Sequence, residues 1–420
     1  MTLVNIISAL GNNNSIYPLL VRDCGIENVA KCAMTYSQNV KESKFIAQQA
    51  TRERIIDEYG TSAVWLGGIP LLGKMCDKVI DMIGLSSKVD TSLLKETTNQ
   101  GLECNIEKFK NVAPKQVEDL LKVKNNKKLF QNAQVAKFLA TTTIPIAIMG
   151  FVLPKVNFSY TNKKIQENKA QKPMFKAPSM VEFTSSLKRK NNQINFTGVE
   201  KLANMSDLNK MMILDGGLTV GRVKTGRNKA EKAELAFKMA GMCYLNYIAP
   251  KSIEKGLNAL TKKLFNINTD LDVKLLDDKS FIKGIKDGAL KLPDAVDEKT
   301  MLDFVDNNPT SIFAQQAKNL KIVEFLDNTV RDPRKFVDIE KLKNLKESIE
   351  EFASDAVKSG SVEKFAKNAL RAKSFNTILN IATSSVLLAL VLPKVQFLFR
   401  KLITGSDVDP AIKEMVKENK

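Results

Sequence analysis

The chain contains no histidine. Histidine is the usual general base near neutral pH and the commonest metal ligand among side chains. Its absence excludes a Ser-His-Asp triad, a Cys-His dyad and every zinc site that includes histidine. Carboxylate, lysine, tyrosine or cysteine chemistry remains open. We therefore lean against an enzyme without excluding one, and we expect neither a metal nor a cofactor.

Cysteine and tryptophan are scarce. The five cysteines form no Cys-x-x-Cys pair, and their number is odd. A zinc ribbon or a disulfide framework is therefore not supported, and we predict buried free thiols in a reducing compartment. The single tryptophan, Trp65, stands beside Gly67 and Gly68. An anchor at a membrane interface and a core residue next to a tight turn explain it equally well.

Acidic residues are outnumbered: Lys+Arg is 64 against Asp+Glu 46, a net charge of +18. Such an excess favours anionic partners such as anionic lipid or nucleic acid. The charge is spread along the chain, so a compositional bias toward lysine explains it equally well. The densest basic patches, 122–128 and 188–190, belong to no recognisable nucleic-acid-binding module. Nucleic acid is therefore possible but not the favoured partner.

Signals for β-strands are also sparse. Alternating runs of Val, Ile and Thr with hairpin turns are nearly absent. The 420 residues are 44% apolar, which is enough for two or three domain-sized cores. The sequence therefore predicts an all-α fold.

What the sequence does contain is internal repetition. Three short matches recur in the same order at separations of 233, 236 and 239 residues: 106–111 with 339–344, 132–137 with 368–373, and 152–156 with 391–395. Upstream, Asp90-x-x-Leu-Leu94 matches Asp272-x-x-Leu-Leu276 at a separation of 182. We predict two tandem homologous helical units, of which the second carries an insert of about 50 residues.

The predicted boundaries follow from these matches. Repeat unit 1 covers 1–160, and a flexible linker rich in Lys, Asn and Pro covers 161–210. Repeat unit 2 covers 211–277 and 336–404, interrupted by a helical insert at 278–335 and followed by a polar tail at 405–420.

Each repeat ends in a long uncharged apolar segment, at 138–154 and 374–393, closed by Leu-Pro-Lys. About 17 to 20 such residues can span a bilayer, and lysines flank both segments. The alternative is a buried helix in a soluble domain. If each repeat crosses a membrane once, the copies must be inverted. If the shorter uncharged patches at 61–70 and 239–250 also cross, the copies are parallel.

An amphipathic helix follows each of those shorter patches. Apolar residues recur at helical spacing in both repeats: Leu72, Met75, Val79, Met82 and Ile83 in the first, and Ile253, Leu257, Leu260 and Leu264 in the second. Such a stripe is typical of a helix that packs one face against other apolar surface.

One glycine-rich stretch, 214–228, is a weak candidate for binding an anion. Its candidate residues are Gly216, Gly217, Gly221, Arg222, Gly226 and Arg227. Amides of a glycine-rich turn before a helix can hold phosphate, but the residues after Gly226 are not the Lys-Ser/Thr of a phosphate-binding loop. A turn that leads into a helix at 229–242 is the preferred interpretation.

These observations predict an all-α protein that is embedded in or attached to the cytoplasmic membrane of a bacterial-type cell. Anionic lipid is its expected partner, and a non-enzymatic structural, scaffold or channel-like role is expected. The alternative is a soluble basic helical protein of the cytoplasm that binds nucleic acid or another protein.

Overall fold

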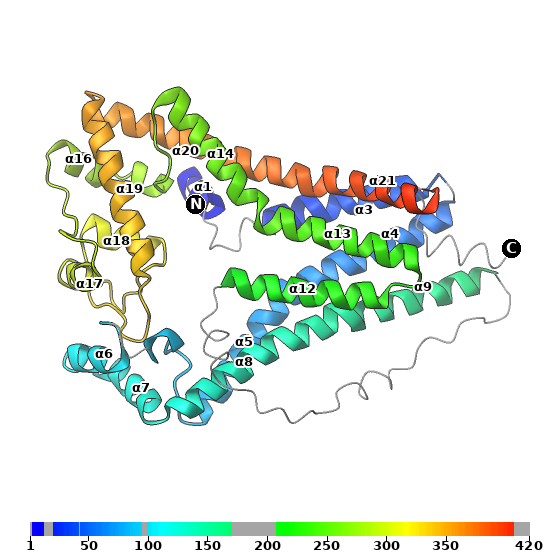
Figure 1. Ribbon diagram of the computed structural model, residues 1–420, viewed down its shortest axis with the longest axis horizontal. Helices are drawn as coiled ribbons and strands as arrows, with labels where there is room; N and C mark the ends of the chain where they lie inside the picture. Colours follow the sequence, from blue (N-terminus) through cyan, green and yellow to red (C-terminus); the bar gives the residue numbers. More distant parts are fainter. Residues whose placement is uncertain (1, 12–19, 42, 95–98, 170–206, 407–420) are drawn as a thin grey trace. The chain divides into compact units, whose positions relative to one another are not determined.

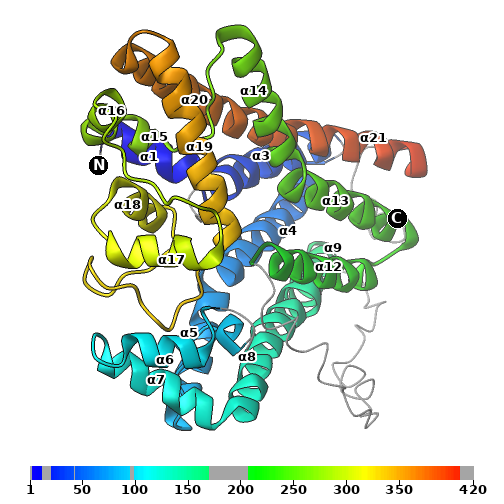
Figure 2. The same ribbon diagram turned by 60° about the vertical axis from the view of Figure 1, so that its left-hand side comes forward.

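The computed structural model describes residues 2–11, 20–41, 43–94, 99–169 and 207–406. Within these ranges the chain forms helices and no strand, apart from one isolated antiparallel bridge between Phe325 and Arg331 (Figures 1 and 2). The predicted all-α fold class is confirmed for the described residues. Most of the predicted linker, 170–206, and most of the polar tail, 407–420, lie outside them.

The chain divides into two compact units, each built from three separate segments. Unit 1 comprises Met1–Arg22, Cys76–Gln134 and Ile248–Ser384. Unit 2 comprises Asp23–Met75, Val135–Tyr247 and Ser385–Lys420. Each unit therefore takes residues from both predicted repeats.

Unit 1 has a large apolar core under short helices. Its helices are α1 (Leu3–Gly11), the end of α5, η3 (Thr91–Leu94), α6 (Leu102–Phe109), α7 (Pro114–Asn125), the start of α8, α14 (Ala249–Phe265), α15 (Val273–Leu276), α16 (Lys279–Lys286), α17 (Glu298–Asn307), α18 (Ile312–Asn319), α19 (Ile339–Lys358) and most of α20. Fully buried Phe281, Phe313 and Phe352 lie in the main core. Residues of the predicted insert, 278–335, thus contribute to this core.

Local sequence explains where these short helices begin. Each of α15 to α19 starts after a residue whose side-chain oxygen accepts a backbone N–H of the first turn: Asp272, Asp278, Asp297, Ser311 and Asp338. Such caps satisfy donors that a helix start otherwise leaves unpaired.

Unit 2 is a bundle of longer helices. Its elements are the end of η1 (Leu20–Glu27), α3 (Asn28–Asn39), α4 (Lys44–Ala63), η2 (Val64–Gly68), the start of α5 (Ile69–Met82), most of α8 (Lys127–Ala147), η4 (Ile148–Val152), α9 (Leu153–Lys169), α12 (Asp207–Thr225), α13 (Lys229–Tyr247), the end of α20 (Val362–Val386), η6 (Leu387–Val391) and α21 (Leu392–Thr404). Short connections make α3–α4 and α12–α13 into hairpins. The helix predicted at 229–242 is present and extends to Tyr247.

Both long apolar helices contain a π-helical turn directly before their Leu-Pro-Lys. In η4 the amide of Leu153 donates to the carbonyl of Ile148, and in η6 the amide of Leu392 donates to the carbonyl of Leu387. A proline has no N–H and its ring clashes with the carbonyl four residues earlier. The wider turn accommodates Pro154 and Pro393 without breaking either helix.

The contacts within unit 2 fix the direction of its helices. Gly217 faces Ile146, Gly221 faces Gly150, and Arg227 lies over the ring of Phe158, so α12 runs parallel to α8–α9. The hairpin makes α13 antiparallel to α12.

The contacts of α13 with α21 give the direction of the second long apolar helix. Gly241 faces Leu392 while Glu234 binds Arg400, so α13 is antiparallel to α21. It follows that α8–α9 and α21 point the same way. These helices therefore have the parallel arrangement, one of the two alternatives that the sequence left open.

The two amphipathic stripes do not pack as their periodicity suggested. On α5, Met75 and Val79 are exposed and Met82 is 76% exposed. On α14, Leu260 and Leu264 are exposed, as is the neighbouring Phe265. Each stripe therefore leaves apolar surface uncovered within the described chain.

Candidate functional site

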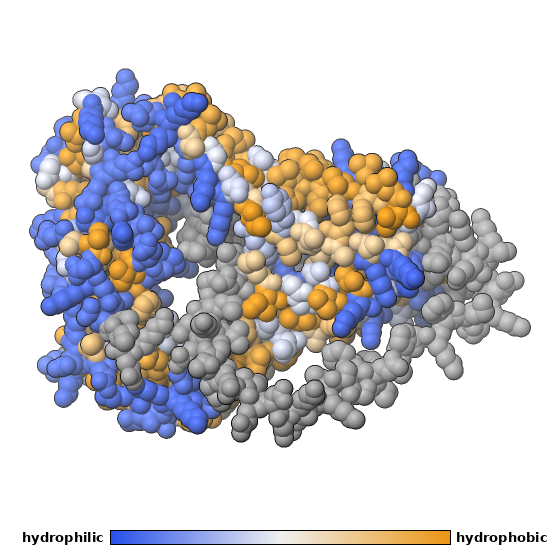
Figure 3. Space-filling model, in the orientation of Figure 1, coloured by the Kyte–Doolittle hydropathy of each residue, from blue (hydrophilic) through white to orange (hydrophobic). Residues whose placement is uncertain are grey.

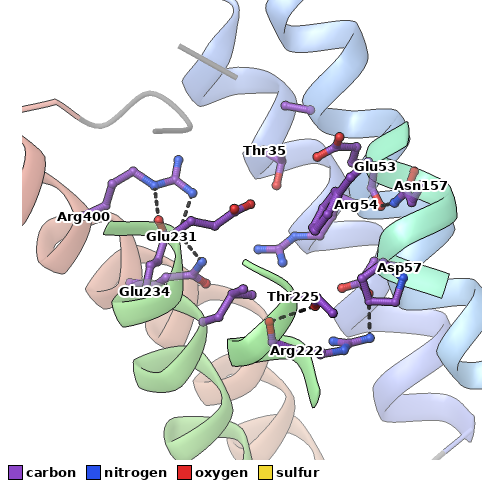
Figure 4. Close-up of a pocket in the computed structure, with 15 residues that line it drawn as sticks. Thr35, Glu53, Arg54, Asp57, Asn157, Arg222, Thr225, Glu231, Glu234 and Arg400 are labelled. Atoms are coloured by element: carbon purple, nitrogen blue, oxygen red, sulfur yellow. Dashed lines mark hydrogen bonds and ion pairs between the residues drawn. The ribbon is translucent and has the colours of Figure 1, made fainter. Parts of the chain in front are cut away.

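A cavity of about 90 Å³ that is partly open to solvent lies between the helices of unit 2 (Figure 4). Six helices line it: α3, α4, α9, α12, α13 and α21. The lining side chains are mostly polar or charged; they are Thr35, Ala50, Glu53, Arg54, Asp57, Pro154, Asn157, Phe158, Arg222, Thr225, Glu231, Glu234, Leu235, Gln396 and Arg400.

Ion pairs between helices form the wall of this cavity. Arg222 of α12 donates to Asp57 of α4 at 2.6 Å. Arg400 of α21 donates through two nitrogens to Glu234 of α13, at 2.8 and 2.5 Å. Gln396, one turn before Arg400, also donates to Glu234, at 2.5 Å. The pairs therefore join helices that lie far apart in the sequence.

Arg227, in the turn after α12, binds two carboxylates together. Its guanidinium lies 3.0 Å from Glu53 and 2.9 Å from Glu231. The face of the same guanidinium lies 4.1 Å from the ring centroid of Phe158. Such a planar cation can form forked hydrogen bonds and stack on an aromatic ring at once.

A second layer of ion pairs surrounds Glu58 of α4. Its carboxylate lies 2.8 Å from Lys238, 3.3 Å from Arg54 and 3.7 Å from Lys31. Lys31 also binds Glu27. Lys31 and Lys238 are almost completely buried.

Together these residues form the buried charge cluster. It contains six carboxylates and six cations: Glu27, Glu53, Asp57, Glu58, Glu231 and Glu234, with Lys31, Arg54, Arg222, Arg227, Lys238 and Arg400. Burying an unpaired charge is very costly, whereas a paired and hydrogen-bonded charge is tolerated. Each charge of this set lies beside an opposite charge of the same set.

Three buried polar atoms of the cavity wall lack a hydrogen-bond partner. They are Oγ1 of Thr35, Oδ1 of Asn157 and Nε of Arg222. The three residues are 8%, 3% and 4% exposed. Each of these atoms is covered by its neighbours and does not face the open space of the pocket, so none of them indicates what the pocket holds.

The candidate anion-binding residues do not form a glycine-rich loop, because most of them lie in a helix. Gly216, Gly217, Gly221 and Arg222 lie inside α12, and Gly226 and Arg227 follow it. Arg222 and Arg227 reach the cavity region, but each binds carboxylates. Gly217 and Gly221 instead permit close packing against Ile146 and Gly150. Anion binding at this stretch stays a prediction that nothing tests.

The carboxylates of the site were not singled out from the sequence. Glu53, Glu58, Glu231 and Glu234 look like residues of solvated helix faces. A usable signal was the absence of a clear apolar stripe on α4 and α13, whose acidic and basic residues are distributed around the helix. A helix that is charged all round and still packed must pair its charges internally.

The other singled-out residues have ordinary surroundings. Trp65 packs, half-buried, against the apolar cluster of Met149, Leu218 and Met239. Gly67 and Gly68 lie with it in the helical element η2 and form no tight turn. The cysteines are free; four are half-buried, and Cys104 is exposed where burial was expected.

Comparison with known proteins adds no relative. No protein-family model, no curated protein and no solved structure matches this chain. The described part of the chain is all-helical, and unit 2 holds a charged cavity. The function of the protein is inferred from that geometry.

Proposed function

We propose that this chain is a non-enzymatic membrane-attached protein of the cytoplasmic membrane, with the outer faces of its unit 2 helices in contact with lipid. The observation that carries this is the exposure of the two long apolar helices. Lys127–Ile165 and Val362–Thr404 are long and apolar enough to cross a membrane, yet only 22% and 33% of their most apolar windows are buried. The core helix of a soluble protein would be mostly covered.

The exposed apolar residues lie along these helices and not at one spot. They include Leu139, Ile144, Ile148, Val152 and Val156 on the first helix, and Ile378, Val386, Leu390, Val395, Leu398 and Leu402 on the second. Figure 3 shows hydrophobic surface over α20 and α21. Monomeric soluble proteins rarely expose apolar surface this extensive.

The polarity of unit 2 supports the same proposal. Its interior holds the buried charge cluster, while Val29, Ile55, Val220 and Tyr244 on four further helices are exposed. Charges that face the interior and apolar groups that face outward are typical of helices in lipid.

The amphipathic helices supply a means of attachment. Besides Leu264 and Phe265, which are exposed at its end, α14 carries the exposed cations Lys251 and Lys255 in its first half. A helix with an apolar face and basic flanks binds the surface of an anionic membrane. Anionic lipid is therefore the proposed partner.

We also propose that the chain arose by duplication of one helical unit. The close contact of Gly60 with Leu153 has a counterpart in Gly241 with Leu392. The glycines lie 181 residues apart and the leucines 239 apart, which agrees with the separations of the sequence matches. The π-helical turns before the two Leu-Pro-Lys segments support the same proposal.

The helix directions limit how the bundle can meet a bilayer. Since α12 runs parallel to α8–α9, its start at Asp207 lies far from Lys169 along the bundle axis. The sequence between these two residues, 170–206, has no uncharged run long enough to cross hydrocarbon. We therefore propose attachment from one side and not six helices that all cross.

Labelling tests this proposal. The full chain, with its cysteines replaced by alanine, receives one new cysteine by Lys164→Cys or Lys210→Cys, both outside 170–206. In sealed inverted vesicles, attachment from one side predicts that a membrane-impermeant maleimide labels both variants. Labelling of only one would show that the bundle is threaded through the bilayer. Release of the protein by an alkaline carbonate wash would contradict contact of the unit 2 helices with hydrocarbon.

The same helix directions favour a second candidate, a soluble protein of the cytoplasm whose apolar faces are covered by a protein partner. This candidate needs no segment to cross lipid. It predicts that the chain remains in solution without detergent, in a complex larger than one copy. With nucleic acid as the partner, the net charge of +18 predicts an affinity that falls steeply as salt rises.

A further inference from the structure

We propose that unit 2 is embedded among the acyl chains of a membrane, with hydrocarbon on two opposite faces of its helix bundle. This inference rests on the proposed lipid contact and duplication, and it adds their geometry: the bundle does not rest on the membrane with one face. The argument is that a twofold axis relates the two repeats within unit 2. Such an axis repeats every outward face on the opposite side of the bundle.

Equivalent helices of the two repeats make equivalent contacts in unit 2. In the first repeat α4 packs against α9, and in the second repeat α13 packs against α21. Gly60 of α4 faces Leu153, and Gly241 of α13 faces Leu392. The two glycines lie 181 residues apart and the two leucines 239 residues apart. Each repeat therefore supplies the same pair of helices to the bundle.

A second contact in each pair fixes the helix directions. Asn157 donates to the backbone carbonyl of Glu53 at 2.9 Å, and Gln396 donates to the carboxylate of Glu234 at 2.5 Å. In both pairs this contact lies earlier on the first helix and later on the second than the glycine contact does. Each pair is therefore antiparallel. Because α9 and α21 point the same way, α4 and α13 also point the same way.

The buried faces of these four helices coincide as well. Six equivalent pairs of residues are buried in both repeats: Ala50 and Glu231, Glu53 and Glu234, Glu58 and Met239, Pro154 and Pro393, Asn157 and Gln396, and Thr161 and Arg400. Their spacing along each helix is that of one helix face. The same face of each repeat thus points into the bundle.

The contacts between the two repeats are reciprocal. From the second repeat, α12 packs against η4 of the first, and from the first repeat, α3 packs against η6 of the second. Two copies related by a twofold axis contact each other in this reciprocal way, each giving the same surface and receiving the same surface. Because equivalent helices also point the same way, the axis runs along the bundle.

Asp57 of α4 and Lys238 of α13 mark the position of this axis. They occupy equivalent positions, 181 residues apart, and Nζ of Lys238 lies 3.8 Å from a carboxylate oxygen of Asp57. Equivalent residues of two copies meet each other only close to the twofold axis. Identical copies would bring like charges together there. The two repeats of one chain carry opposite charges at this point, which attract each other.

The axis turns each outward direction perpendicular to it into the opposite direction. Val152 on the first apolar helix is 48% exposed, and its equivalent, Val391 on the second, is 42% exposed. Val156 and Val395 form another such pair, at 63% and 40%. Apolar surface is therefore exposed on two opposite faces of the bundle. A membrane surface beneath the bundle would cover only one of these faces, whereas acyl chains that flank the bundle cover both and leave the charges inside.

Spin labels on the full chain test this arrangement. With the native cysteines replaced by alanine, Val152→Cys and Val391→Cys are labelled one at a time and reconstituted in vesicles of phosphatidylethanolamine and phosphatidylglycerol. Power saturation measures collisions with oxygen, which partitions into hydrocarbon, and with a water-soluble nickel chelate. Lys299→Cys, at an exposed position of α17 in unit 1, is the reference for water. We expect both valine positions to collide mainly with oxygen.

The other outcomes separate this inference from the proposed function. If one valine position collides mainly with oxygen and the other mainly with nickel, the bundle rests on the membrane by one face. That result would overturn the inference and leave lipid attachment standing. If both positions collide mainly with nickel, unit 2 does not contact hydrocarbon, and the proposed function fails as well.

Distances between labels test the axis without reference to lipid. Tyr59 and Ala240 are equivalent, exposed positions on α4 and α13. A twofold axis requires the distance from Tyr59 to Val391 to equal the distance from Ala240 to Val152. Double electron–electron resonance measures both distances in the Tyr59→Cys/Val391→Cys and Ala240→Cys/Val152→Cys variants of the full chain. Clearly different distances would overturn the axis, and with it the two opposite apolar faces.

Discussion

Gly150 and Gly221 bring two helices of unit 2 into backbone contact. A Cβ at Gly221 would lie 2.9 Å from the Cα of Gly150 and 3.0 Å from its carbonyl oxygen. Such a crossing allows only glycine, because backbone atoms cannot move aside as a flexible side chain can. Close helix crossings at small residues are common in membrane proteins, and this one places Arg222 directly beside Asp57.

This crossing predicts opposite effects for two glycines of α12. We expect Gly221→Ala to lower the free energy of unfolding by about 1–3 kcal/mol, because the added methyl group overlaps the backbone of η4. Gly216→Ala is the matched control, since nothing lies within 4 Å of a Cβ there. It should stabilise the protein by about 0.5–1 kcal/mol through helix propensity. Chemical denaturation in detergent measures both, and a stabilised Gly221→Ala would refute the close crossing.

The pair of Glu234 and Arg400 predicts a non-additive response. Both side chains are only 6% exposed. Arg400→Met should cost about 3–5 kcal/mol, because it leaves Glu234 buried without its cation. Adding Glu234→Gln removes that charge and should restore part of the loss. A double-mutant cycle from denaturation curves measures the coupling. Additive single effects would mean that the two groups do not interact in the folded protein.

The core of unit 1 predicts a strong contrast between two phenylalanines. Phe313 is fully buried, whereas Phe265 is 67% exposed. We expect Phe313→Ala to destabilise the fold by about 3–5 kcal/mol through the cavity that it leaves. Phe265→Ala should change stability by no more than about 0.5 kcal/mol. Thermal unfolding followed by circular dichroism distinguishes the two, and a similar loss in both variants would place Phe265 in a core.

The exposed face of α14 predicts a change in membrane affinity without a change in stability. Replacing Leu264 and Phe265 by serine should weaken co-sedimentation with vesicles that contain anionic lipid, since less apolar surface enters the membrane. Val357→Ser is the control, because Val357 of α19 is also exposed, at 59%, but stands alone on its helix face. Equal sedimentation of all three proteins would count against attachment through α14.

Acid should remove the contribution of one helix cap in unit 1. Hydrogen bonds from Thr300 to Asp297 lower the pKa of that carboxyl. A carboxyl with a lowered pKa contributes stability that is present above its unfolded pKa and is lost as pH falls through the folded value. Asp297→Ala should therefore be less stable than the parent near pH 7, and the difference should shrink below about pH 4. A difference that is constant with pH would assign the effect to helix propensity.

Sequence reasoning predicted the all-α class because strand patterns are nearly absent, and it predicted the helix at 229–242. The proline at the start of α7 and the aspartate caps before α15 to α17 are further local signals, which act within a few residues and were not used. It failed for the stripe of Met75 and Val79, because periodicity indicates that a face is apolar but not what covers it. It also missed Glu53 and Glu234. The sequence pattern around a glutamate on a helix is the same whether its side chain faces water or a buried cation.

The sequence by itself determined the all-helical class, the absence of histidine chemistry and the two uncharged segments before Leu-Pro-Lys, because composition and spacing along the chain are enough for each. Only the tertiary structure decided that the two apolar helices run in the same direction, that Arg222 meets Asp57, and that six helices surround a cavity. These relationships join residues more than a hundred positions apart. They depend on which helix faces pack together, and that choice is made by shape and charge complementarity across the whole bundle.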